Sequence, residues 1–168
     1  MYIHQEESKS NRRISQRGST LVEVLVTIVI LTVAITPAIY LSNLALNIGT
    51  SIRDNLVASF LSQEGVEIVR AIRDANWFSG LAFNAGLADG VYQVEWDDTS
   101  LTPDANAFLK IDATGRYNYL AGTTTLFKRK ITITNISASQ IEIQSTVTWA
   151  ERGRAKSLVI ESRLFNWR

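Results

Sequence analysis

The chain has 168 residues, which is room for one ordinary domain and an appendage, because single domains cluster near about 100–150 residues. It contains no cysteine, so a disulfide framework, a thiolate metal site and a cysteine nucleophile are excluded, and its only histidine is His4. The formal net charge of +1 gives no case for a nucleic-acid partner. We therefore expect a protein that is not an enzyme and that holds no metal or cofactor.

The N-terminal region pairs a polar, basic stretch with a long apolar run. Residues 1–18 are polar, whereas Leu21 to Leu41 is apolar apart from Glu23. As a helix rising about 1.5 Å per residue, this run spans roughly 30 Å, close to the hydrocarbon thickness of a bilayer. Basic residues before a span stay cytoplasmic, so we expect a single pass through the cytoplasmic membrane with everything after Leu41 outside. Those basic residues are Lys9, Arg12, Arg13 and Arg17.

Gly18 and Ser19 form a small-residue pair that precedes the apolar run, whereas a secretory signal places its cleavage site after such a run. Glu23 is costly inside an apolar helix unless a cation lies nearby. If the chain is cut after Gly18, the new α-amino group of Ser19 lies one helical turn from Glu23. Cleavage at this position would create the charge that Glu23 needs.

Residues 18–25, GSTLVEVL, resemble the leader cleavage site of the type IV pilin superfamily. The resemblance implies that a prepilin peptidase cuts between Gly18 and Ser19 and that the new amine of Ser19 is methylated. It also implies that Glu23 serves docking between subunits. The implied partners are other pilin or pseudopilin subunits, an inner-membrane assembly platform and the lipid bilayer. The absence of cysteine separates the chain from the subclasses that close a C-terminal loop with a disulfide.

Two features of this region have a second interpretation. The segment is alternatively a plain signal anchor, in which Gly18 is incidental and Glu23 reaches the membrane interface. Pro37 is either a tolerated kink in a transmembrane helix or, as the family resemblance implies, the mark of a stretch that loosens during assembly.

Beyond Leu41, apolar residues recur at near-helical spacing, which predicts that the helix continues to about residues 74–77 and packs one face on the rest of the chain. Gly49 and Gly65 are expected to be bends. Residues 59–74, SFLSQEGVEIVRAIRD, resemble the matching region of PilV-type minor pilins. The apolar stripe consists of Ile48, Ile52, Leu56, Phe60, Leu61, Ile68 and Ile72.

The rest of the chain is rich in β-branched and aromatic residues, and it predicts half-buried antiparallel strands that pack on the helix. Residues 135–139 are predicted to connect a hairpin. The fold class is therefore α+β, with a long N-terminal helix packed on a small antiparallel sheet. The predicted strands are 91–96, 108–112, 117–120, 126–134, 140–149 and 157–165.

The pattern divides the chain into a leader peptide at 1–18, a transmembrane and polymerisation segment at 19–41, an amphipathic continuation at 42–76 and an extracytoplasmic β-rich head at 77–168. The leading hypothesis is a structural subunit, a minor pilin or pseudopilin, of a type IV pilus-like filament at the cell surface or in the periplasm. The alternative is a single-pass membrane-anchored binding domain or adhesin that does not polymerise.

The head contains an acidic loop with Asp97, Asp98 and Asp104. These carboxylates could offer oxygens to Ca²⁺, although their spacing does not match an EF-hand, and a solvated turn is the favoured interpretation. Residues 112–115, DATG, are predicted to form a hairpin turn.

A basic group is formed by Arg152, Arg154 and Lys156, which share parity and would line one face of an extended segment, with Lys128 and Lys130 beside them. Such a ridge could bind DNA or another acidic surface. The favoured interpretation is a solvent-facing strand edge that resists aggregation.

The tryptophans Trp77, Trp96, Trp149 and Trp167 could together form a platform that binds a carbohydrate or another surface. More commonly such residues fill a small core or a subunit contact, and Trp167 is expected to be the most exposed.

Overall fold

A computed structural model describes the backbone of residues 7–167 and the side chains of residues 20–167. The leader expected at 1–18 therefore lies outside the described side chains, as does the side chain of Ser19. The chain divides into two compact units, one ending at Thr50 and one beginning at Ser51.

One helix, α1, spans Glu7–Phe78 and includes Pro37 in its interior. The predicted helix end near residues 74–77 is confirmed to within one residue. After Phe78 the chain turns through Gly80, whose positive φ of 70° suits a residue without a Cβ.

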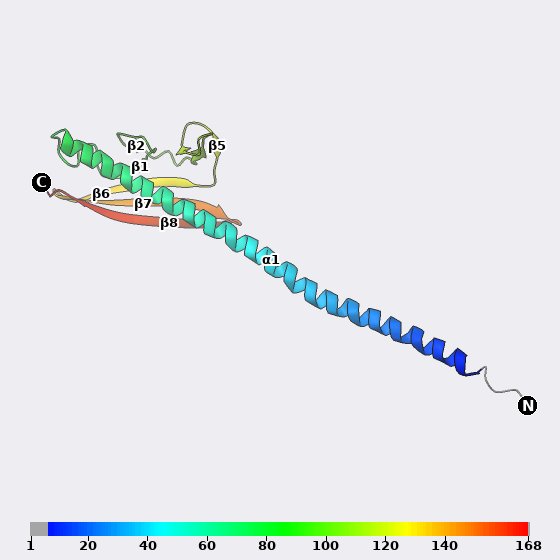
Figure 1. Cartoon of the computed structure of the whole chain (residues 1–168). Coiled ribbons are helices and arrows are strands. Elements are labelled where there is room, and N and C mark those ends of the chain that lie inside the picture. Colours follow the sequence, from blue (N-terminus) through cyan, green and yellow to red (C-terminus); the bar gives the residue numbers. More distant parts are fainter. Residues whose placement is uncertain (1–6, 168) are drawn as a thin grey trace, which may run out of the picture. The chain divides into compact units, whose positions relative to one another are not determined.

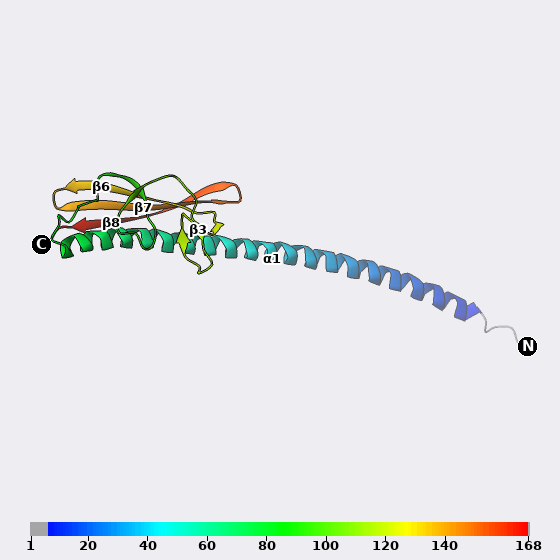
Figure 2. The same ribbon diagram turned by 90° about the horizontal axis from the view of Figure 1, so that it is seen from above.

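The second unit combines the C-terminal part of α1 with two antiparallel sheets, which confirms the predicted α+β, pilin-like fold. Within residues 7–167, the larger sheet has the strand order β2-β1-β6-β7-β8 and the smaller one has the order β4-β3-β5. Figures 1 and 2 show β6, β7 and β8 side by side along the part of α1 that belongs to this unit. The strands are β1 (Gly90–Gln93), β2 (Thr102–Pro103), β3 (Lys110–Ile111), β4 (Tyr117–Asn118), β5 (Thr123–Thr124), β6 (Lys128–Ser137), β7 (Gln140–Glu151) and β8 (Arg154–Phe165).

The connection between β6 and β7 is shorter than predicted. Residues 135–137 belong to β6, with a shift of register between Asn135 and Ser137, so only Ala138 and Ser139 lie between the two strands. A β-bulge of this kind keeps a strand paired while it adds a residue. The prediction of a five-residue connection was wrong because simple alternation stops at the irregularity.

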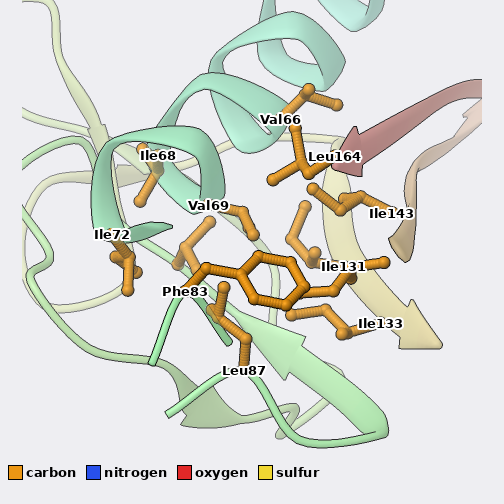
Figure 3. Close-up of a cluster of buried hydrophobic side chains, with 12 residues drawn as sticks. Val66, Ile68, Val69, Ile72, Phe83, Leu87, Ile131, Ile133, Ile143 and Leu164 are labelled. Atoms are coloured by element: carbon orange, nitrogen blue, oxygen red, sulfur yellow. The ribbon is translucent and has the colours of Figure 1, made fainter. Parts of the chain in front are cut away.

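The core lies between α1 and the larger sheet. Alternate residues of β7 are buried, as are Ile131 and Ile133 of β6, because successive side chains of a strand point to opposite faces. Figure 3 shows side chains of α1, including Val69 and Ile72, meeting Phe83 and Leu87 from the loop that follows the helix. A second buried cluster joins the helix to β7 and to the residues just before β3 and β6. It contains Ala58, Leu61, Leu109, Phe127, Val147 and Trp149.

Only part of the predicted helical stripe is buried. Leu61, Ile68 and Ile72 lie in the core as expected, but the others are exposed, including Leu56 and Phe60. A spacing of four residues overshoots the helical period of about 3.6, so a strict i, i+4 row winds around the helix and leaves the packed face. The exposed members of the predicted stripe are Ile48, Ile52, Leu56 and Phe60.

The packed face of α1 is built partly from small residues. Ala58, Ser62 and Gly65 are buried, and a Cβ at Gly65 would come within 2.6 Å of Ile131 Cδ1 and 2.8 Å of Ser145 Oγ. Gly65 therefore permits the close approach of the helix to β6 and β7. The sequence predicted a bend at this glycine and did not predict this packing role.

A buried arginine connects three elements of the head. Arg129 of β6 is 1% exposed, and its guanidinium donates hydrogen bonds to the carbonyl oxygens of Leu61 in α1, at 3.0 Å, and of Val94 after β1. Its Nη1 also lies 3.3 Å from Glu64 Oε1. On the backbone side, the hydroxyl of Tyr119 donates to the Arg129 carbonyl at 3.0 Å, and burial raises the pKa of Tyr119. The guanidinium therefore fastens the helix and the loop after β1 to β6.

Candidate processing and assembly site

The first unit presents an apolar surface that its own residues do not cover. Every described side chain from Thr20 to Thr50 is exposed, and the helix from Thr20 onward is long and apolar enough to cross a membrane. Exposed apolar surface on this scale needs lipid or protein around it. The helix is consistent with membrane anchoring.

Glu23 lies in α1 near the start of this apolar stretch and is exposed. One turn later, Thr27 donates from Oγ1 to the Glu23 carbonyl oxygen at 2.7 Å. This bond satisfies the threonine hydroxyl within its own helix, as is usual for threonine in an apolar environment. The Glu23 carboxylate, by contrast, is presented to whatever surrounds the helix.

Pro37 lies within the same apolar stretch. A proline has no N–H, so the carbonyl four residues earlier, that of Val33, cannot receive its helical hydrogen bond. Next to it, Thr36 donates from Oγ1 to the Thr32 carbonyl at 2.8 Å. Around Pro37, one backbone hydrogen bond of the helix is therefore missing, and the Thr36 side chain makes an additional one.

Gly18 and Ser19 belong to the backbone of α1, five and four residues before Glu23. Beyond the backbone, the structure describes nothing at these two positions. The proposed cut and the glutamate are therefore close along one helix, as their spacing predicts.

The acidic loop is held by backbone contacts. Asp98 Oδ2 accepts from the Glu95 N–H at 2.7 Å, and Asp104 Oδ1 accepts from the Asn106 N–H at 3.0 Å. These are the local bonds by which aspartates stabilise turns. Within residues 20–167, no three His, Cys, Asp or Glu side chains are grouped so that they could hold a metal ion.

The turn predicted at residues 112–115 is confirmed as the link between β3 and β4. Asp112 Oδ1 accepts from the backbone N–H of Thr114 and of Arg116, and from the Thr114 hydroxyl at 2.6 Å. These hydrogen bonds, that of the Thr114 side chain foremost, lower the pKa of Asp112.

The basic residues do not form one ridge. Lys156 pairs with the buried Trp149 across the β7–β8 ladder and so belongs to the helix-facing side of the sheet, whereas Lys130 pairs with Thr146 on the other side. Arg152 lies outside β8, in a turn with Gly153 where φ is 50° and 74°. The prediction of a shared face was wrong because it treated Arg152, a turn residue, as part of an extended strand. It also compared residues of different strands without knowing how those strands are paired.

The four tryptophans are also dispersed rather than gathered into a platform. Trp149 is in the core beside Phe127, while Trp77 and Trp167 meet edge to face with ring centroids 4.8 Å apart. Trp96 lies under the guanidinium of Arg116, 4.1 Å from it, and Trp167 is 70% exposed, as predicted for a residue near the terminus.

Residues 13–39 match the family described as the prokaryotic N-terminal methylation motif. No curated protein and no solved structure matches the chain. The motif supports a type IV pilin-like precursor that is processed at its N-terminus, and proteins with it are structural rather than catalytic. A leader of this kind implies processing by a prepilin peptidase and assembly with pilin subunits in general.

Sequence reasoning missed two features that organise the head. Arg129 lies between Lys128 and Lys130 in a run that resembles a solvated strand, and only its parity with Ile131 and Ile133 could have indicated burial. The second is the open edge of β8, which depends on the strand order and cannot be read from local sequence.

Proposed function

We propose that the chain is a minor pilin or pseudopilin, cut after Gly18 and assembled through its N-terminal helix into a type IV pilus-like filament. The observation that carries the proposal is the match of residues 13–39 to the methylation motif, which spans Gly18, Glu23 and most of the apolar stretch. The full exposure of residues 20–50 supports it, because that surface needs lipid before assembly and neighbouring subunits afterwards.

In this proposal, the chain has four parts with separate roles. The leader, 1–18, stays in the cytoplasm and is removed, and residues 19–41 hold the subunit in the inner membrane. Residues 42–76 continue the helix into the head, 77–168, outside that membrane. The four basic residues of the leader favour this orientation.

Cleavage supplies the charge for docking. The new amine of Ser19, methylated or not, is a cation at neutral pH, and in the filament it meets the Glu23 carboxylate of a neighbouring subunit. Pro37 interrupts one helical hydrogen bond in the same stretch, so the helix can loosen there when it leaves the bilayer.

Mass spectrometry of the N-terminal peptide from membranes tests the processing step. The mature chain is expected to begin at Ser19, with a methyl group on its amine. A Gly18→Leu variant should remain at full length, whereas the control Gly49→Leu, in the same helix, should be processed normally. An intact N-terminus in the unaltered protein would contradict the proposal and favour a lone anchored binding domain.

Docking has its own test. Glu23→Ala should insert in the membrane and be cleaved but should no longer co-purify with sister pilins, while Glu67→Ala, an exposed helical glutamate of the head, should behave as the unaltered protein does. Normal incorporation of Glu23→Ala would refute the docking role without affecting the cleavage site.

A further inference from the structure

The larger sheet has one closed edge and one open edge. At one edge, β2 has only two residues and contains Pro103, which has no N–H to donate to a further strand. At the other edge, β8 has twelve residues and pairs along its whole length with β7. Among residues 7–167, no strand pairs with the outer side of β8. The outer side of β8 is therefore a long unpaired edge of this sheet, to which a further strand can add.

The register shows which backbone groups face outward. Asn166 donates its N–H to the Ser139 carbonyl at 2.8 Å, so this opposed pair is hydrogen-bonded across the β7–β8 ladder. Hydrogen-bonded pairs alternate along antiparallel strands, so the even-numbered residues of β8 bond to β7. The odd-numbered residues from Ala155 to Phe165 direct their N–H and C=O groups to the open edge, and all of them are exposed.

The turn before β8 agrees with this assignment. Arg152 and Gly153 both have positive φ, as in a two-residue type I′ hairpin, and such a turn is closed by a hydrogen-bonded pair, here Glu151 and Arg154. Arg154 is even-numbered, so the turn and Asn166 lead to the same result: the even-numbered residues of β8 are the ones that bond to β7.

Side chains along the edge indicate what could bind there. Leu158 and Ile160 face the helix side, one against each core cluster, but both are only partly buried. Nearer the turn, the same side carries the exposed cations Arg154 and Lys156, with Arg152 in the turn itself. Along the strand, the edge thus changes from apolar to basic towards its N-terminal end.

We propose that the open edge of β8 binds an extended segment of another protein as an antiparallel strand, with an acidic carboxyl-terminal end against Arg154 and Lys156. Antiparallel addition continues the pattern of the sheet and places the carboxyl end of the segment at the basic end of β8. Apolar residues at alternate positions would cover Leu158 and Ile160. This binding is independent of the N-terminal processing site.

A second copy of the chain is a poorer occupant. Its β2 edge is closed by Pro103, and its β8 carries only even-numbered side chains on the helix side, none of which is acidic. A second copy therefore offers no carboxylate to complement Arg154 and Lys156, whereas opposite charges across a strand pair stabilise it.

The test uses the full-length chain in detergent micelles and two fluorescein-labelled ten-residue peptides of alternating valine and threonine. One peptide ends in two glutamates and the other in two lysines. Fluorescence anisotropy is expected to show the acidic peptide binding about tenfold more tightly, with the difference shrinking as salt is added, because surface charges are screened. Equal affinity of the two peptides, or no binding of either, overturns the proposal.

The matched variants alter the edge without altering the core. Val159→Pro removes an outward N–H and should abolish binding, whereas Val159→Thr keeps that N–H and should bind as before. Lys156→Glu should remove the preference for the acidic peptide. If Val159→Pro loses its far-UV circular dichroism, Ser157→Pro serves in its place, because its N–H also faces outward. Undiminished binding by the folded proline variant, or a dimer of the chain that this variant dissolves, contradicts the proposal.

Discussion

At the scale of single residues, the guanidinium of Arg129 lies at the junction of α1, the loop after β1 and β6. Arg129→Ala is expected to lower the free energy of unfolding by about 3–5 kcal/mol, because it leaves Glu64 and the buried Val94 carbonyl without the guanidinium. Arg163→Ala, at an exposed arginine of β8, should change it by less than about 1 kcal/mol. Urea unfolding of the detergent-solubilised chain, followed by tryptophan fluorescence, measures both. A loss below about 1 kcal/mol for Arg129→Ala would show that the guanidinium is replaceable.

Gly65 allows a prediction of opposite outcomes for two glycines in one helix. Gly65→Ala places a methyl group within 2.8 Å of Ser145 Oγ and closer still to Ile131, and overpacking of this kind costs about 1–3 kcal/mol. Gly49→Ala meets nothing within 4 Å, so the better helix propensity of alanine should leave the melting temperature unchanged or higher. Circular dichroism at 222 nm compares the two, and an equal effect would argue against close packing at Gly65.

Individual residues differ in how far the sequence determines their role. Gly18 and Glu23 could be identified because their meaning depends on spacing within one short segment, which the sequence displays directly. The role of Arg129 depends on carbonyls 68 and 35 residues away, and no local pattern carries that information. The burial of Gly65 likewise follows from the approach of two strands that are distant in the sequence.

At the scale of elements, Asp89 joins the start of β1 to β6. Its Oδ1 accepts from the Asn135 N–H at 2.6 Å and from Asn135 Nδ2 at 2.8 Å, and these bonds lower the pKa of Asp89 below 3.8. A carboxyl whose pKa is lower in the folded state stabilises the fold fully above its unfolded pKa. That contribution is lost as the pH falls through the folded pKa.

Asp89→Asn tests this linkage. The variant should be less stable than the unaltered protein at pH 7 and should lose less stability between about pH 5 and pH 2, because its side chain does not titrate. Thermal unfolding at several pH values gives the two curves. Asp97→Asn, in the exposed acidic loop, is the control and should keep the steeper acid dependence; parallel curves for Asp89→Asn would contradict the predicted role.

The sequence predicted well those elements that are long enough to show a repeating pattern. Alternation over the regions of β6 and β7 and the sustained apolar pattern of α1 gave their types and most of their extent. The two-residue strands β2 and β5 were not predicted, since two residues have no period. The prediction of which face of α1 packs on the sheet was partly wrong, because the small residues on that face do not stand out in a pattern of large apolar residues.

At the scale of the whole molecule, the buried hydrophobic core lies entirely within the second unit, from Ala58 to Leu164. We expect a chain that begins at Ser51 to fold without detergent and to unfold cooperatively, because no core side chain is removed. The full-length chain should require detergent or lipid to stay monomeric, since its residues 20–50 are exposed and mostly apolar. Near-UV circular dichroism and analytical ultracentrifugation make the comparison, and a molten or aggregated head would show that the first unit contributes to folding.

The contacts of Arg129 also set an order of events during synthesis. The Leu61 carbonyl is made early, but its guanidinium partner follows 68 residues later, and β7 and β8 later again. Until then, the buried face of α1 has no sheet to pack against, and closing such long loops is the slow step in folding. Nascent chains that end before β6 therefore leave the packed face of α1 uncovered, and it stays so until the last three strands have emerged.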